Sequence, residues 1–349
     1  MRKLKFSEAI NEAISQSMMK NKRVIVVGLG SDDPKGIFGT TLGLKEKFGP
    51  ERVFDLPTSE NAITGICIGL ATEGLIPIFA HQRVEFSLLT IEQIFNQAAK
   101  WHFMSAGKKR VPLVIRLIIG RGWGQGPQHS QSLESIFAHI PGLIVVSPST
   151  SSDAKGMLIS SIKNKNPVIF FEHRWLHGNF GNVPKDFYTT PLTKSKILRK
   201  GKSISIISYS FMAIESLKAS KILEKFGISC EILDLRCLRP LDKKSIVNTA
   251  KKNNLVLVVD SGMPSFGISA EVMATLLDYS TTKFQISRIG LAETPIPSTQ
   301  SLAKYIYPTY ISICFKVFSL LEISIPQEIL NSKDYYSSDQ PDKNFTGPF

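Results

Sequence analysis

The nine residues Val-Pro-Leu-Val-Ile-Arg-Leu-Ile-Ile at positions 111–119 decide the fold of this chain. Only Pro112 and Arg116 interrupt the apolar run, which stops at a loop with glycine at positions 120, 122, 124 and 126. A strand that is apolar on both faces is typical of a parallel sheet with helices on each side, because neither face of such a sheet meets water. We therefore predict an interior strand over residues 111–119.

Helical and extended patterns alternate outward from this strand. Upstream, we predict strands at 23–27, 53–56 and 76–79, with helices at 6–18, 59–73 and 87–104. Downstream, we predict helices at 131–139 and 152–162 and strands at 143–147 and 168–172, and a second alternating series begins at Ser203. This order predicts the α/β class, with two domains that are each a mainly parallel sheet flanked by helices.

The alternation lapses between Gly178 and Lys202, where glycine, proline, lysine and threonine prevail. Such a stretch is typical of a linker. We predict a first domain at 1–184, a linker at 185–202 and a second domain at 203–321. Residues 322–349 form a polar, proline-containing tail, which we expect to lie outside the core, either disordered or against a partner.

Composition excludes several classes of protein. The chain has 349 residues, of which 43% are hydrophobic and 20% charged, as in soluble globular proteins. We see no apolar run long enough to cross a bilayer and no secretory signal at the N-terminus. The four cysteines show neither metal-type nor redox-type spacing, which favours a reduced, cytoplasmic protein.

The formal net charge of +13 raises the question of nucleic-acid binding. The basic residues do not form one stripe, however, and stand in short groups at Lys20–Arg23, Lys108–Arg110 and Lys251–Lys252. We find no nucleic-acid motif beside them. We therefore expect no nucleic-acid partner, and interpret the charge as solvated helix ends that also attract an acidic partner or an anionic substrate.

Several motifs, taken in order, carry a family resemblance. They are Lys47–Glu60 (KFGPERVFDLPTSE), Asn96–Lys100 (NQAAK), Gln128–Glu134 (QHSQSLE), Pro141–Leu143 with Asp153–Gly156, and Asp234–Arg236 with Arg239–Asp242. Over about residues 5–320 the chain resembles the β subunit of the first component of pyruvate and branched-chain 2-oxoacid dehydrogenases, within the transketolase-like family. The resemblance implies a pyrimidine-binding domain at 1–184 and a transketolase C-terminal-like domain at 203–321. It implies an oxidoreductase subunit that uses thiamine diphosphate to decarboxylate a 2-oxoacid and passes the acyl group to a lipoyl carrier.

Glu60 is the first candidate for catalysis and for cofactor binding. A carboxylate at a helix start is commonly explained by its interaction with the backbone and the helix dipole. The resemblance implies more for Glu60, namely a hydrogen bond to the 1′ nitrogen of the cofactor's aminopyrimidine ring. The acid would favour the tautomer of the ring whose own nitrogen removes the weakly acidic thiazolium proton.

Three further residues are assigned by the same resemblance. It implies that Phe86 lies against the aminopyrimidine ring, that Gln82 is near the cofactor, and that His129 is a catalytic residue near the thiazolium. Each has a plainer interpretation, as a core phenylalanine, an exposed loop amide and a structural histidine. No residue is predicted to bind a metal.

The chain also departs from the family pattern. Leu29 stands where the family usually has a glutamate. Ala80 stands where the family often has an acidic residue, and Arg83 stands where it often has an aromatic residue. The change at Leu29 argues against a proton relay between paired active sites. His81 and Arg83 suggest a more polar or anionic 2-oxoacid. Asn164 stands where some relatives have an aspartate that helps hold potassium.

The sequence contains no Gly-Asp-Gly, the motif by which family enzymes hold Mg²⁺ and the cofactor's diphosphate. We therefore predict that an α-type subunit carries this half of the site, in a heterotetramer of two α-type and two β-type subunits. A lipoyl acyltransferase is a further predicted partner.

Two alternatives remain open. One is a split transketolase or a carboligating thiamine-diphosphate enzyme, which would share the cofactor but use another acceptor. The other is a non-catalytic assembly subunit of the same fold. A Glu60→Gln variant distinguishes a catalytic subunit from a non-catalytic one. The substitution should remove most of the turnover of a catalytic subunit, and it should have no effect on a subunit that serves only in assembly. A nucleotide-binding Rossmann enzyme is set aside, since no full glycine fingerprint with its downstream acid occurs.

Overall fold

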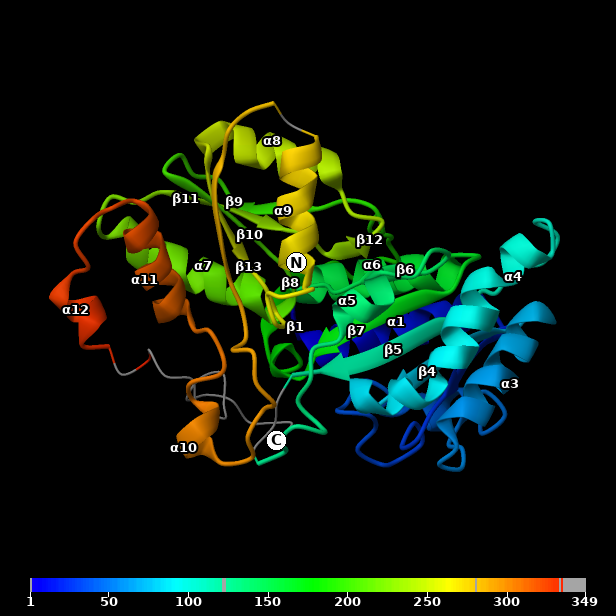
Figure 1. The fold of residues 1–349 in the computed structure, drawn as a ribbon. Coiled ribbons are helices and arrows are strands. Elements are labelled where there is room, and N and C mark those ends of the chain that lie inside the picture. The colour runs from blue at the N-terminus through cyan, green and yellow to red at the C-terminus, as the bar shows by residue number, and fades with distance from the viewer. Residues whose placement is uncertain (1, 121–123, 280, 333, 335–349) are drawn as a thin grey trace. The chain divides into compact units, whose positions relative to one another are not determined.

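The computed structural model describes residues 2–120, 124–279, 281–332 and 334, and the chain divides into two compact units. The described residues of the first unit are 2–120 and 136–192, and the second unit holds the others. Figure 1 shows the elements of both units.

The first unit is built on a parallel sheet whose strands lie in the order β6, β7, β5, β4, β2, β3. In chain order these strands are β2 (Val24–Val27), β3 (Val53–Phe54), β4 (Ile76–His81), β5 (Val114–Ile119), β6 (Ile144–Val146) and β7 (Val168–His173). All six residues of β5 are buried, so the predicted interior strand is confirmed. It begins at Val114, three residues later than predicted, because Pro112 cannot donate a ladder hydrogen bond.

Helices cover both faces of this sheet. They are α1 (Phe6–Lys20), α2 (Leu44–Phe48), α3 (Glu60–Thr72), α4 (Ala99–Met104) and α6 (Ser151–Lys163). The short helix α5 (Glu134–Ala138) has only its last three residues in this unit. Helices α1 and α6 pack together, while α3 packs against β4. In Figure 1, α3 and α4 lie on one side of the strands and α1 on the other. A short antiparallel ribbon joins β1 (Arg2–Lys5) to β8 (Phe180–Val183).

The predicted helix at 87–104 is instead three short elements. They are η1 (Val84–Thr90), a 3₁₀ helix, then η2 (Gln93–Ala98), a π-helix, and finally α4. The hydroxyls of Ser87 and Thr90 donate to the carbonyls three residues before them, which suits the tighter 3₁₀ turn. A second short 3₁₀ helix, η3 (Arg174–Leu176), follows β7.

The second unit has its own sheet, in the order β14, β13, β10, β11, β9. Its strands are β9 (Lys196–Arg199), β10 (Ile204–Ser208), β11 (Cys230–Asp234), β12 (Cys237–Arg239), which lies outside this order, β13 (Leu255–Val259) and β14 (Gln285–Ile289). The four strands from β14 to β11 are parallel, and the edge strand β9 is antiparallel. The predicted α/β class, with a mainly parallel sheet in each half, is confirmed.

Helices again flank the sheet of the second unit. They are α7 (Ser210–Glu224), α8 (Lys243–Asn253), α9 (Ile268–Asp278), α10 (Gln300–Ala303), α11 (Tyr310–Leu320) and α12 (Gln327–Leu330). Helix α7 packs with α11, and α8 with α9, while α7 and α8 both contact β10 and β11. Asp242 caps α8 by accepting a hydrogen bond from the Ser245 amide at 3.3 Å.

Two predicted boundary segments contain regular structure. The segment predicted as a linker includes β9, which pairs with β11. The segment predicted as a tail begins with α12, whose Ile329 is buried and which packs on α11. The remainder of that tail, 335–349, lies outside the described residues.

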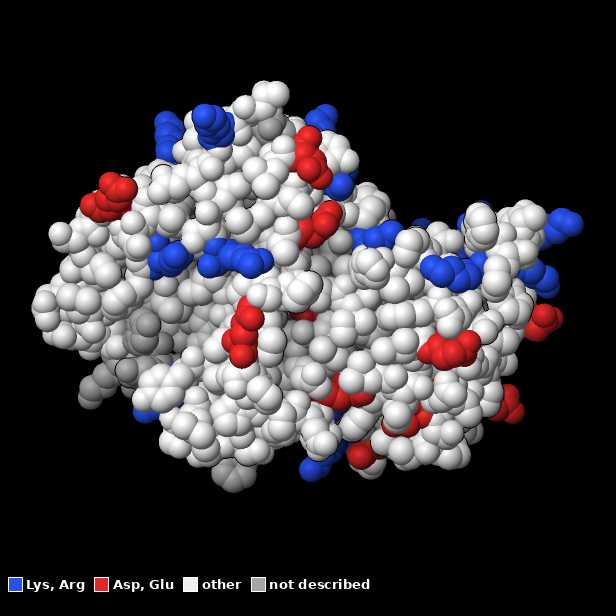
Figure 2. All heavy atoms as spheres, viewed as in Figure 1, with Lys and Arg blue, Asp and Glu red and all other residues white. Residues whose placement is uncertain are grey.

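Surface charge agrees with the sequence pattern. On the face shown in Figure 2, lysine and arginine side chains stand in separate small groups among acidic and uncharged residues. Among the described residues, no helix is both long enough and apolar enough to span a bilayer.

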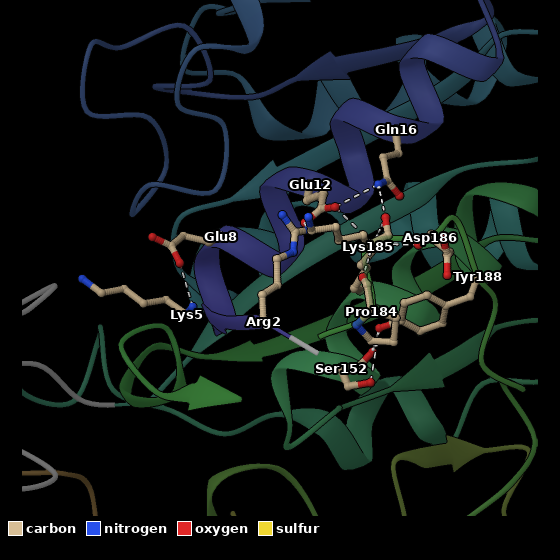
Figure 3. Close-up of polar contacts among 11 residues, drawn as sticks. Arg2, Lys5, Glu8, Glu12, Gln16, Ser152, Pro184, Lys185, Asp186 and Tyr188 are labelled. Carbon is tan, nitrogen blue, oxygen red and sulfur yellow. Dashed lines mark hydrogen bonds and ion pairs between the residues drawn. The ribbon is translucent and has the colours of Figure 1, made fainter. Parts of the chain in front are cut away.

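A buried lysine on α6 binds the segment 184–186, near the end of the first unit. Lys155, on α6, donates to the carbonyl oxygens of Pro184 and Asp186 at 2.8 Å and of Lys185 at 3.2 Å, and to the Glu12 carboxylate at 3.2 Å. Figure 3 shows these acceptors converging from α1 and from the segment after β8. The ammonium group thus meets four oxygens, one of them charged, within the same unit.

Candidate active site

A pocket that is open to solvent lies in the first unit, and its volume, including the space at its opening, is about 350 Å³. Its lining comes from the segments that follow β2 and β3 and from the end of β4, which are neighbouring parallel strands. The lining residues are Leu29, Leu56–Glu60, Ile63, Phe79–Gln82 and Phe86. The carboxyl edge of a parallel sheet is where α/β folds usually bind ligands, because the loops there are free to vary.

Glu60 is the first residue of α3, and its half-buried side chain lines the pocket. The turn Pro57–Ser59 brings the chain from the end of β3 to this helix start. Within the described part of the chain, the Glu60 carboxylate makes no hydrogen bond or ion pair. It is therefore available to accept a hydrogen bond from a ligand.

Gln82 also lines the pocket. Its Nε2 donates to the carbonyl oxygen of Leu29 at 2.8 Å, which ties the loop after β2 to the end of β4. The loop depends on Gly30, which has φ +75° and whose added Cβ would lie 2.6 Å from the Gln82 Nε2. The amide oxygen of Gln82 is left for a ligand in the pocket.

Phe86 comes from η1 and completes the pocket together with the apolar side chains Leu56, Ile63 and Phe79. The structure therefore brings Glu60, Gln82 and Phe86 into one pocket, although the sequence separates them by up to 26 positions. Among the described residues that line this pocket, Glu60 is the only acidic one.

The departures from the family pattern also fall here. Leu29 and Ala80 line the pocket in place of acidic residues, and Leu29 is 42% exposed. Burial lowers the pKa of His81 to about 3, so this wall residue is neutral at pH 7. The pocket thus offers a single carboxylate among mostly apolar walls.

His129 is not part of this pocket. It lies in the segment 124–135, which belongs to the second unit, and its Nδ1 contacts the carbonyl oxygen of Gln128. The amide of His129 bonds to the Gly126 carbonyl oxygen at 3.5 Å. The catalytic role predicted for His129 stays a prediction.

Glu134 and Asp260 form a buried acidic pair in the second unit, and neither is among the predicted site residues. Burial raises the pKa of Glu134 to about 8, and the charge of Asp260 in the same unit adds to the effect. Asp260 Oδ1 accepts from the Tyr209 hydroxyl at 2.5 Å and from the Gly262 amide at 3.0 Å. The sequence gives no signal for this group, because its members are spread over about 125 positions.

The pocket fits one part of a thiamine cofactor. A flat heteroaromatic ring requires apolar walls, which Leu56, Ile63 and Phe86 provide. A ring nitrogen that carries a proton requires an acceptor, and Glu60 is placed to be one. The described residues that line the pocket include no lysine or arginine to hold a diphosphate.

Comparison with known proteins agrees with this geometry. Residues 2–178 match the family model "Transketolase, pyrimidine binding domain", and residues 193–313 match "Transketolase, C-terminal domain". Among solved structures, the "Split gene transketolase, inactive beta4 tetramer" has a TM-score of 0.75 and 20% identity, and the match covers 92% of this chain and 99% of that one. This likeness shows the fold. The chain is thus a transketolase-like protein with a pyrimidine-binding half and a C-terminal half.

Curated relatives define the family more narrowly. The chain is 39% identical over 320 residues to the acetoin:2,6-dichlorophenolindophenol oxidoreductase subunit beta of Cupriavidus necator, with 88% of this chain and 94% of the relative covered. It is 37% identical to the mitochondrial pyruvate dehydrogenase E1 component subunit beta of Pisum sativum, covering 86% of each. For the Rickettsia felis pyruvate dehydrogenase E1 component subunit beta the identity is 34%, covering 86% of this chain and 93% of the relative. The chain belongs to the family of β subunits of the first component of 2-oxoacid dehydrogenases, as predicted.

Proposed function

We propose that this chain provides the aminopyrimidine side of a thiamine diphosphate site in an enzyme that decarboxylates a 2-oxoacid and transfers the acyl group to a lipoyl carrier. The observation that carries the proposal is the position of Glu60, a half-buried carboxylate at a helix start in a pocket with apolar walls. The family membership supports the reaction class.

Each pocket residue has a distinct part in this proposal. Thiamine diphosphate, when bound, supplies a nucleophilic carbon and an electron sink for the departing carboxylate. Glu60 would hold a proton at the ring nitrogen that faces it, by accepting a hydrogen bond from the protonated nitrogen, and so would favour the imino tautomer of the ring. Phe86 and Ile63 exclude water from the ring, and Gln82 orients the exocyclic amino group through its amide oxygen. His129, from the second unit, is proposed to act at the reacting carbon or at acyl transfer.

The other half of the site is proposed to arrive on a partner. An α-type subunit would hold the diphosphate and Mg²⁺, because this sequence has no Gly-Asp-Gly. We propose a heterotetramer of two α-type and two β-type subunits, and a lipoyl acyltransferase as the carrier of the acceptor. Residues 1–184 and 203–321 would serve as the pyrimidine-binding and C-terminal-like domains, joined by 185–202 and followed by the tail at 322–349. The compartment is proposed to be the cytoplasm, which the four buried cysteines support.

A second candidate substrate is acetoin, because a relative at 39% identity is named for it. Acetoin has no carboxylate to lose, so the two candidates differ in whether carbon dioxide is released. Measuring carbon dioxide release with pyruvate and product formation with acetoin, using the same preparation, separates them.

The test of the proposed site is a pair of variants on α3. Glu60→Gln keeps the shape of the side chain but removes the carboxylate, and we expect turnover to fall at least about 100-fold while assembly with the partner is retained. The control is Glu73→Gln, since Glu73 is exposed at the other end of the same helix and should leave turnover within twofold. Unchanged turnover in Glu60→Gln would make the chain an assembly subunit instead.

A further inference from the structure

The wall of the pocket contains a polar residue that has no part in the proposed function. His81 is the last residue of β4, lines the pocket and is 3% exposed. The other polar residues of the described lining are less buried, since Glu60 and Gln82 are half-buried and Thr58 and Ser59 are exposed. His81 is thus the most deeply buried polar residue among the described residues that line this pocket.

The imidazole ring of His81 lies beside the ring of Phe79. Alternate residues of a strand point to the same face, so these two side chains project together from β4. Their ring centres are 4.4 Å apart and the rings are tilted by 55°. Both residues line the pocket, so the imidazole belongs to its wall. The phenyl ring has no nitrogen or oxygen with which to pair the imidazole nitrogens.

The imidazole of His81 makes no hydrogen bond within the described part of the chain. Its Nε2 atom is buried and has no partner there, and no described residue bonds to its Nδ1 atom. Buried polar groups nearly always have a hydrogen-bond partner, because burial removes the water that would otherwise serve. The position of His81 on the pocket wall points to a ligand in the pocket as that partner.

The charge of His81 defines the kind of group that it can bind. Burial lowers the pKa of His81 to about 3, so the ring is neutral at pH 7. A neutral imidazole donates a hydrogen bond through one nitrogen and accepts one through the other. It therefore suits an uncharged polar group, such as a hydroxyl, a carbonyl, an amine or a ring nitrogen.

The other charged groups of the pocket narrow the expectation of a more polar or anionic 2-oxoacid. Arg83, which shared that expectation with His81, is not among the described residues that line the pocket. The described lining contains no lysine or arginine, and its carboxylate, Glu60, would repel a second negative charge. A polar but uncharged group fits this wall better than an anionic one.

We propose that His81 is a further ligand-binding residue of this pocket, and that its imidazole ring hydrogen-bonds an uncharged polar group of the bound molecule. The inference rests on the proposed function, in which the pocket holds the aminopyrimidine ring. Two sources of such a group are then present. One is the second ring nitrogen of the aminopyrimidine, and the other is the carbonyl or hydroxyl oxygen of the substrate.

Such a hydrogen bond would make His81 a determinant of specificity. A site that is built to hydrogen-bond a ligand disfavours an analogue without the matching group, because the buried donor or acceptor is then left unpaired. His81 would therefore favour ligands that carry the polar group over apolar analogues of the same size.

Two substitutions, studied in the complex of this chain with its partner, test the proposal. His81→Leu removes both ring nitrogens, whereas His81→Gln keeps a donor and an acceptor. We expect His81→Leu to raise the dissociation constant of thiamine diphosphate, with Mg²⁺ present, or the KM of the substrate by about tenfold. His81→Gln should stay within about threefold of the original chain for both quantities. No change in His81→Leu, or equal losses in both variants, would overturn the proposal.

The two measurements distinguish the source of the polar group. A weaker binding of thiamine diphosphate with an unchanged KM would assign the hydrogen bond to the aminopyrimidine ring. A higher KM for pyruvate or acetoin with unchanged cofactor binding would assign it to the oxygen of the substrate. The control is His139→Leu, which should leave both quantities within twofold, because His139 is exposed.

Glu60→Gln, made in the same complex, distinguishes a failure of this inference from a failure of the proposed function. If Glu60→Gln loses turnover while His81→Leu changes neither quantity, the proposed function stands and the role of His81 falls. If Glu60→Gln keeps full turnover, the proposed function falls and the role of His81 falls with it.

Thermal unfolding of the full chain without cofactor gives a readout that a purely structural role would not produce. His81→Leu replaces an unpaired buried polar group by an apolar one, so the variant should unfold at the same temperature as the original chain or higher, although it binds its ligand more weakly. Unfolding at a clearly lower temperature would show that the imidazole has its partner within the chain, and would contradict the proposal. Should His81→Leu not fold, His81→Phe makes the same comparison, since it keeps a flat ring without nitrogen.

Discussion

Lys155 and Arg83 are both buried cationic side chains of the first unit, but their surroundings differ. The ammonium group of Lys155 meets three carbonyl oxygens and the Glu12 carboxylate, all from the same unit (Figure 3). Arg83 packs over the Phe38 ring, as Arg174 does, and its Nη1 has no partner among the described residues.

The difference lies in how each cation is partnered. Lys155 is compensated by groups of its own unit, and it fixes the segment 184–186 against α1 and α6. Arg116, another buried cation of this unit, is paired with the Glu172 carboxylate. Such a pair is costly to break, because removing one partner leaves the other charge buried without compensation.

The largest expected effect comes from removing the Glu172 carboxylate. Glu172→Gln leaves Arg116 without its ion pair, and we expect a loss of about 3–5 kcal/mol in the free energy of unfolding. Denaturant titration measures this loss. A loss below about 1 kcal/mol would mean that Glu172 is not the main compensating charge.

The next effect is expected at the compensated lysine. Lys155→Met leaves the carbonyl oxygens of Pro184, Lys185 and Asp186 without their shared donor, and we expect a loss of about 2–4 kcal/mol. Lys163→Met is the control, because Lys163 is exposed at the end of the same helix. A loss at Lys155 no larger than the loss at Lys163 would mean that the buried ammonium group does not hold the segment 184–186 in place.

The smallest effect is on the pH dependence of stability. Burial lowers the pKa values of His81 and His173 to about 3, so the unfolded chain, with ordinary values near 6.5, binds more protons. Stability is therefore full above about pH 6.5 and falls as the pH drops from 6.5 towards 3. We expect the two histidines together to lower the free energy of unfolding by about 2 kcal/mol between pH 6.5 and pH 5.5.

Variants separate these histidines from other titrating groups. His81→Gln should remove about half of that loss in denaturant titrations at the two pH values. His139→Gln should leave the loss unchanged, because His139 is exposed. An unchanged pH dependence in His81→Gln would show that His81 is not the buried neutral group that the structure describes.

The sequence predicts the parts of this fold that rest on local patterns. The run at 111–119 gives β5 because a strand covered on both faces is apolar throughout. The structure of the segment 84–104 is harder to predict, since 3₁₀, π and α turns place apolar residues at similar spacings. Hydroxyl groups such as those of Ser87 and Thr90 bias the turn, and their bonds are seen only in the folded chain.

The candidate site shows the same limit. The family resemblance predicts Glu60, Gln82 and Phe86 as site residues, and the structure places them in one pocket. The burial of Arg116 and Arg174 could not be predicted, because most arginines lie at the surface and their sequence neighbours do not show which of them the fold buries. A sequence shows which residues are charged, but not which of them the fold buries together.

The central claim is that this chain carries only the aminopyrimidine side of a thiamine diphosphate site. The most direct test is to purify the chain from its own cells by affinity and then to measure cofactor binding. The account predicts that a subunit with Gly-Asp-Gly co-purifies, and that the pair binds thiamine diphosphate with Mg²⁺ while this chain alone does not. A chain that returns without a partner and binds no cofactor under any condition would contradict the account and leave the assembly role in its place.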